Sequence, residues 1–410
     1  MMNRLITGGS RAASRIAVGL VLSSMAACGG ASSDSMDSGQ QPAAYVYVAS
    51  ADVSAGTMPG AVYQYSIGAD GSVAPLSVAS VPTGVTPRAV VSDPSGHYVY
   101  VVNEGDATIS QYAVGADGVL AALSPAVVPI GGPQNAGYTA SIDPSGKFLY
   151  VVGSPRDPAG PAASIAQYAI QSGGTLAPLA QAYLSLSVFA SGTLAIDSTG
   201  QYAYLPGAAG APGGLVSQFA INADGTLSPL TPATVAAAQG TLAVTIAPGG
   251  QTAYVMSACT DTACDGQIEA YAIGTNGTLT PTRVVTGVGS HIDPMEMATD
   301  ASGANAYVLT NAMGVDTNAG AVYEYAVGST GALTADMPAS LPVASGAVAE
   351  STYGNNLYAL SANAAGFASG QPSGGHIDQY VIGSDGLLTA ASTATVAGSL
   401  PTSMTLVATH

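Results

Sequence analysis

Residues 93–103 read Asp-Pro-Ser-Gly-His-Tyr-Val-Tyr-Val-Val-Asn, a tight turn followed by a short apolar run, and versions of this stretch recur along the chain. Tyrosines in such runs stand 50 to 54 residues apart: Tyr47, Tyr100, Tyr150, Tyr204, Tyr254, Tyr307 and Tyr358. A second aromatic series keeps the same phase: Tyr65, Tyr112, Tyr168, Phe219, Tyr271, Tyr325 and Tyr380. A fixed period of about 50 residues is typical of a repeat protein built radially or as a solenoid.

One unit, residues 86–131, shows what each repeat contains. Four runs of strand-like sequence, at 88–92, 97–103, 108–114 and 119–129, are joined by turns rich in Asp, Pro and Gly. The second turn closes on a glycine in all seven units: Gly71, Gly118, Gly174, Gly225, Gly277, Gly331 and Gly386. We therefore predict an all-β chain folded as a seven-bladed β-propeller of four-stranded antiparallel blades. A β-solenoid is the alternative, but it would show shorter coils and capping ends.

The ends of the repeat region predict how the ring closes. The first turn keeps its glycine six times, not seven: Gly96, Gly146, Gly200, Gly250, Gly303 and Gly354. The region begins with a second strand, 44–49, and ends with a first strand, 402–408. Pairing this C-terminal inner strand with the N-terminal strands completes one blade and removes the open edges of an incomplete ring. The propeller is thus expected over residues 43–410.

Residues 1–27 have the layout of a secretory signal peptide. Three arginines and no acid precede the apolar stretch Ile16–Ala27, and small residues stand before Cys28. This junction resembles the bacterial lipoprotein box, which implies that Cys28 is lipidated and becomes the mature N-terminus. Gly29 at the next position implies, by the same resemblance, the outer membrane. Residues 28–42 form the expected flexible tether, and plain secretion is the alternative to a lipid anchor.

Two further cysteines, Cys259 and Cys264, lie between two predicted strands. Export would place them in an oxidising compartment, so we predict a local disulfide between them. A zinc site would need more ligands, and no histidine lies within about twenty residues of the pair.

The composition excludes several classes of function. Charged residues make up 8% of the chain, and the net charge of −17 leaves seven basic residues for 410 positions. Nucleic-acid binding needs a basic face and is not expected. No dedicated calcium loop, phosphate loop or Gly-x-Ser-x-Gly elbow is present, so we predict neither a metal nor a cofactor. We expect a monomer that touches the membrane only through its lipid.

The repeat unit resembles the lactonase/YVTN propeller family, which includes 6-phosphogluconolactonase-type enzymes. The resemblance is carried by residues 93–103, by Tyr-Val-Leu-Thr-Asn at 307–311 and by the Gln-Tyr-Ala-Val-Gly-Ala-Asp-Gly-Val-Leu segment at 111–120, and it covers the chain from about residue 43 to the end. It implies the propeller fold and leaves two functions open. The almost uncharged inner ring favours a module that binds a small molecule or a protein at the cell envelope. The alternative is hydrolysis of a sugar lactone or related compound.

The candidate site lies where the inner strands meet the face that carries the variable loops. Counting back from the first turn gives seven equivalent inner positions, six small and one carboxylate: Ala89, Thr139, Thr193, Ala243, Glu296, Ala347 and Ser403. If the chain is an enzyme, we expect Glu296 or His291 to act as base and Arg88 to bind an oxyanion or carboxylate. The structural alternative is that Glu296 and Arg88 form an ion pair or bind water.

Three further residues are predicted ligand contacts: Tyr138, Asn103 and His376. Enzymes of the family carry Pro-Arg-His on an inner strand. Here Thr86-Pro87-Arg88 matches in part, Ala89 replaces the histidine, and Tyr138 takes the place of a second family histidine.

Overall fold

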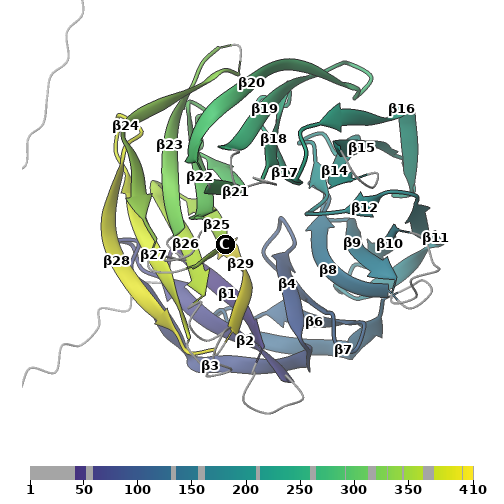
Figure 1. The fold of residues 1–410 in the computed structure, drawn as a ribbon. Coiled ribbons are helices and arrows are strands. Elements are labelled where there is room, and N and C mark those ends of the chain that lie inside the picture. The colour runs from purple at the N-terminus through teal and green to yellow at the C-terminus, as the bar shows by residue number, and fades with distance from the viewer. Residues whose placement is uncertain are drawn as a thin grey trace, which may run out of the picture. The chain divides into compact units, whose positions relative to one another are not determined.

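The computed structural model describes residues 42–409 except 52–58, 131–134, 156–161, 209–212, 259–264, 291, 313–319, 330, 344–345, 363–373 and 399. Across these residues the regular elements are β-strands, gathered into seven antiparallel sheets that form the blades of a propeller (Figure 1). Alternating apolar residues, together with Asp, Pro and Gly at the turns, produce this all-β chain. The prediction of a seven-bladed propeller is confirmed.

The strands of each blade are given in order from the centre of the ring outward. Blade 1 contains β29 (Leu400–Ala408), β1 (Ala44–Ala51), β2 (Pro59–Ile67) and β3 (Val73–Val85). Blade 2 contains β4 (Pro87–Ser92), β5 (Tyr98–Asn103), β6 (Thr108–Val114) and β7 (Leu120–Pro129). Blade 3 contains β8 (Asn135–Ile142), β9 (Phe148–Pro155), β10 (Ala163–Ile170) and β11 (Leu176–Leu186). Blade 4 has a divided inner strand, and it contains β12 (Phe189–Ala190), β13 (Ala195–Ile196), β14 (Tyr202–Ala208), β15 (Gly214–Ile221) and β16 (Leu227–Ala237).

The remaining blades repeat the pattern. Blade 5 contains β17 (Thr241–Ile246), β18 (Thr252–Ser257), β19 (Asp265–Ile273) and β20 (Leu279–Ser290). Blade 6 contains β21 (Ile292–Thr299), β22 (Asn305–Ala312), β23 (Gly320–Val327) and β24 (Leu333–Pro342). Blade 7 contains β25 (Gly346–Tyr353), β26 (Asn356–Ala362), β27 (Gly375–Ile382) and β28 (Leu388–Val396).

The two ends of the propeller meet in blade 1, as predicted. Strand β29 pairs antiparallel with β1, from Ala44 opposite Ala408 to Ala51 opposite Leu400. The last strand of the chain is therefore the innermost strand of the blade that the first three strands build (Figure 1).

The two repeating signals of the sequence contact each other across every blade junction. Each periodic tyrosine is buried and donates its hydroxyl to the carbonyl of the turn glycine in the next blade. The seven O···O distances are 2.6–2.9 Å, for Tyr47–Gly118, Tyr100–Gly174, Tyr150–Gly225, Tyr204–Gly277, Tyr254–Gly331, Tyr307–Gly386 and Tyr358–Gly71. The last of these joins blade 7 to blade 1 and completes the ring.

Buried glutamines form a second set of links that the sequence analysis did not identify. In blades 1 to 4 the side-chain amide of Gln64, Gln111, Gln167 or Gln218 donates to a carbonyl of its own outer strand. The oxygen of the same amide accepts the backbone N–H that begins the outer strand of the next blade, at Leu120, Leu176, Leu227 and Leu279. One polar side chain thus satisfies buried backbone groups of two neighbouring blades.

Replacing Tyr150 with phenylalanine tests the tyrosine links. The change keeps the aromatic ring of the side chain but leaves the buried carbonyl of Gly225 without its hydrogen-bond donor. The free energy of unfolding should therefore fall by about 1–2 kcal/mol. Urea denaturation followed by circular dichroism measures the loss. Tyr183→Phe on the exposed outer strand β11 is the control and should change stability by less than about 0.5 kcal/mol. Equal effects of the two changes would contradict the assigned role.

Deleting residues 401–410 tests the closure. The truncation removes most of β29 and exposes the inner edge of β1, so cooperative unfolding should be lost or its midpoint sharply lowered. Deletion of His410 alone is the control and should melt like the full-length chain. A protein without residues 401–410 that also melts like the full-length chain would refute closure by β29.

Candidate functional site

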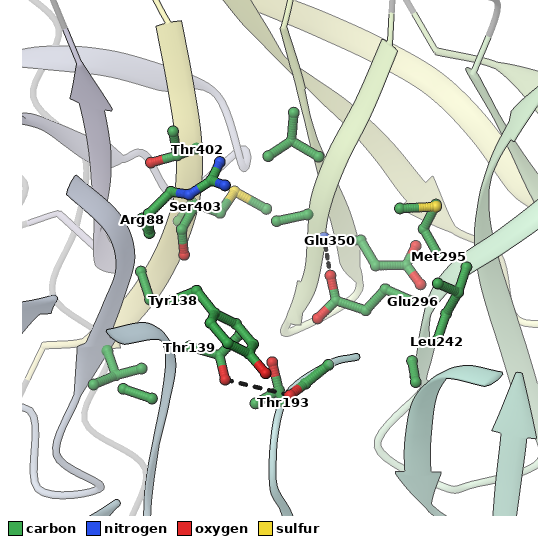
Figure 2. Close-up of a pocket in the computed structure, with 18 of the residues that line it drawn as sticks. Arg88, Tyr138, Thr139, Thr193, Leu242, Met295, Glu296, Glu350, Thr402 and Ser403 are labelled. Carbon is green, nitrogen blue, oxygen red and sulfur yellow. Dashed lines mark hydrogen bonds between the residues drawn. The ribbon is translucent and has the colours of Figure 1, made fainter. Parts of the chain in front are cut away.

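An open cavity of about 670 Å³ lies at the centre of the propeller and is lined by inner segments of all seven blades (Figure 2). Most of the described residues that line it are small or apolar, and its hydroxyl groups come from threonine, serine and Tyr138. Among these lining residues, one arginine and two glutamates bring basic and acidic groups to the wall: Arg88, Glu296 and Glu350. The cavity can therefore hold a small, mostly neutral molecule with a few directed polar contacts.

A bulge in six inner strands supplies one side chain each to the cavity. In each of these blades, one residue of the inner strand has no opposite residue on the second strand. Such a residue lies, for example, between Pro87 and Ala89 and between Pro294 and Glu296. These residues all line the cavity: Arg88, Tyr138, Leu242, Met295, Val348 and Thr402. A bulge leaves its extra residue unpaired and re-aims that side chain, which explains why this ring is chemically varied.

Glu296 extends from β21 toward the inner strand of blade 7. Its Oε2 accepts the backbone N–H of Glu350 at 3.0 Å (Figure 2). Burial raises the pKa of Glu296 to about 7, although the N–H of Glu350 acts to lower it. A carboxyl group with this pKa is ionised in about half of the molecules at neutral pH, as a general base requires.

Glu350 is the functional candidate that the sequence analysis missed. Blade 7 has a first turn of two residues, since Tyr353 pairs directly with Asn356. Ser351 consequently lies opposite Tyr358, and Ala349 lies opposite Leu360, two residues after that tyrosine. Glu296 lies opposite Leu309, two residues after Tyr307. Ala349, not the predicted Ala347, is therefore the counterpart of Glu296. The side chain of Glu350 is 7% exposed, and its Oε1 accepts the backbone N–H of Ala298 at 2.9 Å. Burial and the nearby charge of Glu296 raise its pKa well above the usual range.

Arg88 forms its ion pair with Glu104 rather than with Glu296. Its Nε lies 2.7 Å from Oε2 of Glu104, which follows β5 on the variable-loop face. Figure 2 shows Arg88 and Glu296 entering the cavity from different inner strands, Arg88 on β4 and Glu296 on β21. The structural alternative of a direct Arg88–Glu296 pair is therefore not what the structure shows.

The three predicted ligand contacts have different positions. Tyr138 lines the cavity and donates its hydroxyl to the carbonyl of Ala190 at 2.9 Å. Asn103 is fully buried and bonds Thr83, Gly84, Thr108 and Ser110, so its amide holds the crossover into blade 2 against the β5–β6 hairpin. His376 lies on β27, away from the described wall of the cavity.

Other predicted features lie outside the described residues: His291, the signal peptide and tether with Cys28, and the pair Cys259 and Cys264. Within the ranges that the structure describes, no cluster of three or more His, Cys, Asp or Glu side chains could hold a metal ion. The same ranges contain no helix long and apolar enough to span a bilayer.

Comparisons with known proteins agree with this fold. The family model described as "Lactonase, 7-bladed beta-propeller" matches residues 59–205. A search of curated proteins found no match. The periplasmic gluconolactonase PpgL of Pseudomonas aeruginosa superimposes with a TM-score of 0.66 at 19% identity, over 90% of this chain and 99% of that one. A putative 6-phosphogluconolactonase of Bacteroides fragilis gives 0.67 at 18% identity, over 89% and 98%. The chain is thus similar to the lactonase propellers, by sequence over residues 59–205 and by fold over nearly its whole described length.

Proposed function

We propose that this chain hydrolyses a neutral, hydroxylated lactone in its central cavity, with Glu296 as the general base. The observation that carries the proposal is the Glu296 carboxyl group, which is held at the cavity wall by the N–H of Glu350 and has a pKa of about 7. The match to the lactonase model and the fold of a periplasmic gluconolactonase support the same reaction class.

The chemistry follows from the groups in the cavity. Glu296 removes a proton from water as the water oxygen attacks the lactone carbonyl carbon. Arg88, oriented by Glu104, stabilises the negative charge that develops on the carbonyl oxygen. The ring C–O bond then breaks, and the alkoxide leaving group takes the proton from Glu296. Lactone and water become a hydroxy acid, and the carboxyl group returns to its starting state.

The charges of the cavity favour a neutral substrate. Two glutamates line the wall, and the guanidinium of Arg88 is already paired with Glu104. A dianionic phosphate would meet the negative charge of Glu296 and a largely apolar wall, with little positive charge to offset its own. We therefore propose an unphosphorylated lactone.

Binding without turnover is the second candidate function. The observation that favours it is the replacement of the two family histidines by Ala89 and Tyr138, both on the cavity wall. A module of this kind would recognise a small ligand through the bulge residues and the variable loops.

Replacing Glu296 with glutamine tests the hydrolase. Purified wild-type protein should open one or more aldonolactones faster than the spontaneous reaction, and kcat/KM should rise with pH to a plateau above about pH 7 as Glu296 loses its proton. Glu296→Gln should lower kcat/KM by roughly 10²–10⁴-fold and abolish the rise, since the amide cannot accept the proton.

The matched control is Glu269→Gln, a carboxyl group on β19 that accepts the N–H of Ala238 but does not line the cavity. It should keep wild-type kcat/KM. An absence of turnover on every lactone, with ligand binding that Arg88→Ala weakens, would replace hydrolysis by the binding function.

We further propose that the protein is an extracytoplasmic monomer, anchored by a lipid on Cys28 at the outer membrane. The Arg-rich start, the apolar stretch Ile16–Ala27 and the small residues before Cys28 support this location. Expressed in a Gram-negative host, the wild type should sediment with membranes and incorporate labelled palmitate. Cys28→Ala should move to the soluble fraction, whereas Cys259→Ala should stay with the membrane. Membrane retention of Cys28→Ala would overturn the anchor.

A further inference from the structure

Glu350 lies at a position of the inner strand that is occupied by apolar side chains in the other blades. The pairing of the inner strand with the second strand gives its counterparts in five blades: Val90, Ala140, Val244, Met297 and Met404. In blade 4 the equivalent residue is Leu194, which directly precedes the paired Ala195. Burying a carboxyl group at such a position destabilises the fold unless the group is well bonded. The packing of six blades shows that the fold itself does not need an acid there.

The side chains of Glu350 and Glu296 both form hydrogen bonds between strands β21 and β25. Glu296 on β21 accepts the N–H of Glu350 on β25 (Figure 2). In return, the side chain of Glu350 accepts the N–H of Ala298 on β21. Each side chain thus bonds the backbone of the strand that carries the other. The reciprocal bonds fix the distance between the two strands and the orientation of both carboxyl groups.

We propose that Glu350 is a positioning residue for Glu296: by accepting the N–H of Ala298 it fixes β25 against β21, and so holds the Glu296 carboxyl group at the cavity wall. The inference rests on the proposed function, because it concerns the same base. The effect of Glu350 on the titration of Glu296 can, however, be measured without any substrate.

The physical reason is that two adjacent carboxyl groups in a poorly solvated place cannot both ionise. Glu350 is the more enclosed of the two, and burial together with the charge of Glu296 keeps it protonated at neutral pH. The other described titratable side chains on the cavity wall are Arg88 and Tyr138, and Arg88 is paired with Glu104. The remaining proton therefore stays on Glu350, and Glu296 titrates alone near pH 7.

Two substitutions separate positioning from core packing. Glu350→Gln resembles the protonated acid in shape and still accepts the N–H of Ala298, so kcat should stay within about threefold of the wild type with the same pH midpoint. Glu350→Met copies Met297 of blade 6 and loses the bond. It should lower kcat at least tenfold with little change in KM, and raise the pH midpoint because Glu296 loses a polar neighbour.

The second measurement does not need turnover. The pKa of Glu296 is raised by folding, so the folded state binds its proton more tightly and stability falls as pH rises from about 4.5 to about 7. The difference in unfolding free energy between each variant and its Glu296→Gln double mutant, measured from pH 4.5 to 8, isolates this titration. The wild type and Glu350→Gln should give the same curve, and Glu350→Met should shift it to higher pH. Glu269→Met, which also loses a backbone N–H contact but lies outside the cavity, should leave the curve unchanged.

Two results would overturn the inference. Glu350→Met with a wild-type Glu296 titration would make Glu350 a packing residue. Glu350→Gln with a lowered Glu296 midpoint would mean that Glu350 acts as an anion. If no lactone is hydrolysed but the stability curves behave as expected, the proposed function fails while the positioning of Glu296 by Glu350 stands.

Discussion

The hydrogen bond from a buried tyrosine to a turn glycine of the next blade is the contact on which the ring depends. A tyrosine hydroxyl in a closed junction needs an acceptor, and the chain provides a backbone carbonyl 2.6–2.9 Å away at all seven junctions. The acceptor must be glycine because its φ is positive and a side chain of the preceding blade leaves no room for a Cβ. A Cβ on Gly118, for example, would lie 2.3 Å from the ring of Tyr45. The tyrosine in the strand of one repeat and the glycine in the turn of the next repeat must therefore be kept together.

This pairing explains why the fold could be predicted from the sequence. The tyrosines and glycines keep a period because each must meet a partner one blade away, so the fold and the closing strand were both evident from spacing alone. The glutamine links were also periodic, at Gln64, Gln111, Gln167 and Gln218, and could have been found by the same comparison.

The site was harder to predict, because it depends on local departures from the repeat. The bulges that aim Arg88 and Tyr138 into the cavity leave no mark in a sequence read as regular strands. The shortened turn of blade 7 shifted the counterpart of Glu296 from Ala347 to Ala349, and so hid Glu350. Asn103, chosen as a ligand contact, has its hydrogen-bonding groups occupied by its own blade and the crossover into it. Glu296 was visible in the sequence as the one carboxylate among small inner positions, and Arg88 and Tyr138 through the partial match to the family motif.

Closure by β29 also sets an order of events during synthesis. Strand β1 needs a partner that is made about 350 residues later, which is roughly 20–70 s at 5–20 residues per second. Throughout that interval the inner edge of blade 1 has no strand to pair with, and the central cavity has no complete wall. Until β29 is made, this edge can pair with the exposed edge of another chain, so the closure that protects the finished propeller leaves its first blade open to misassembly.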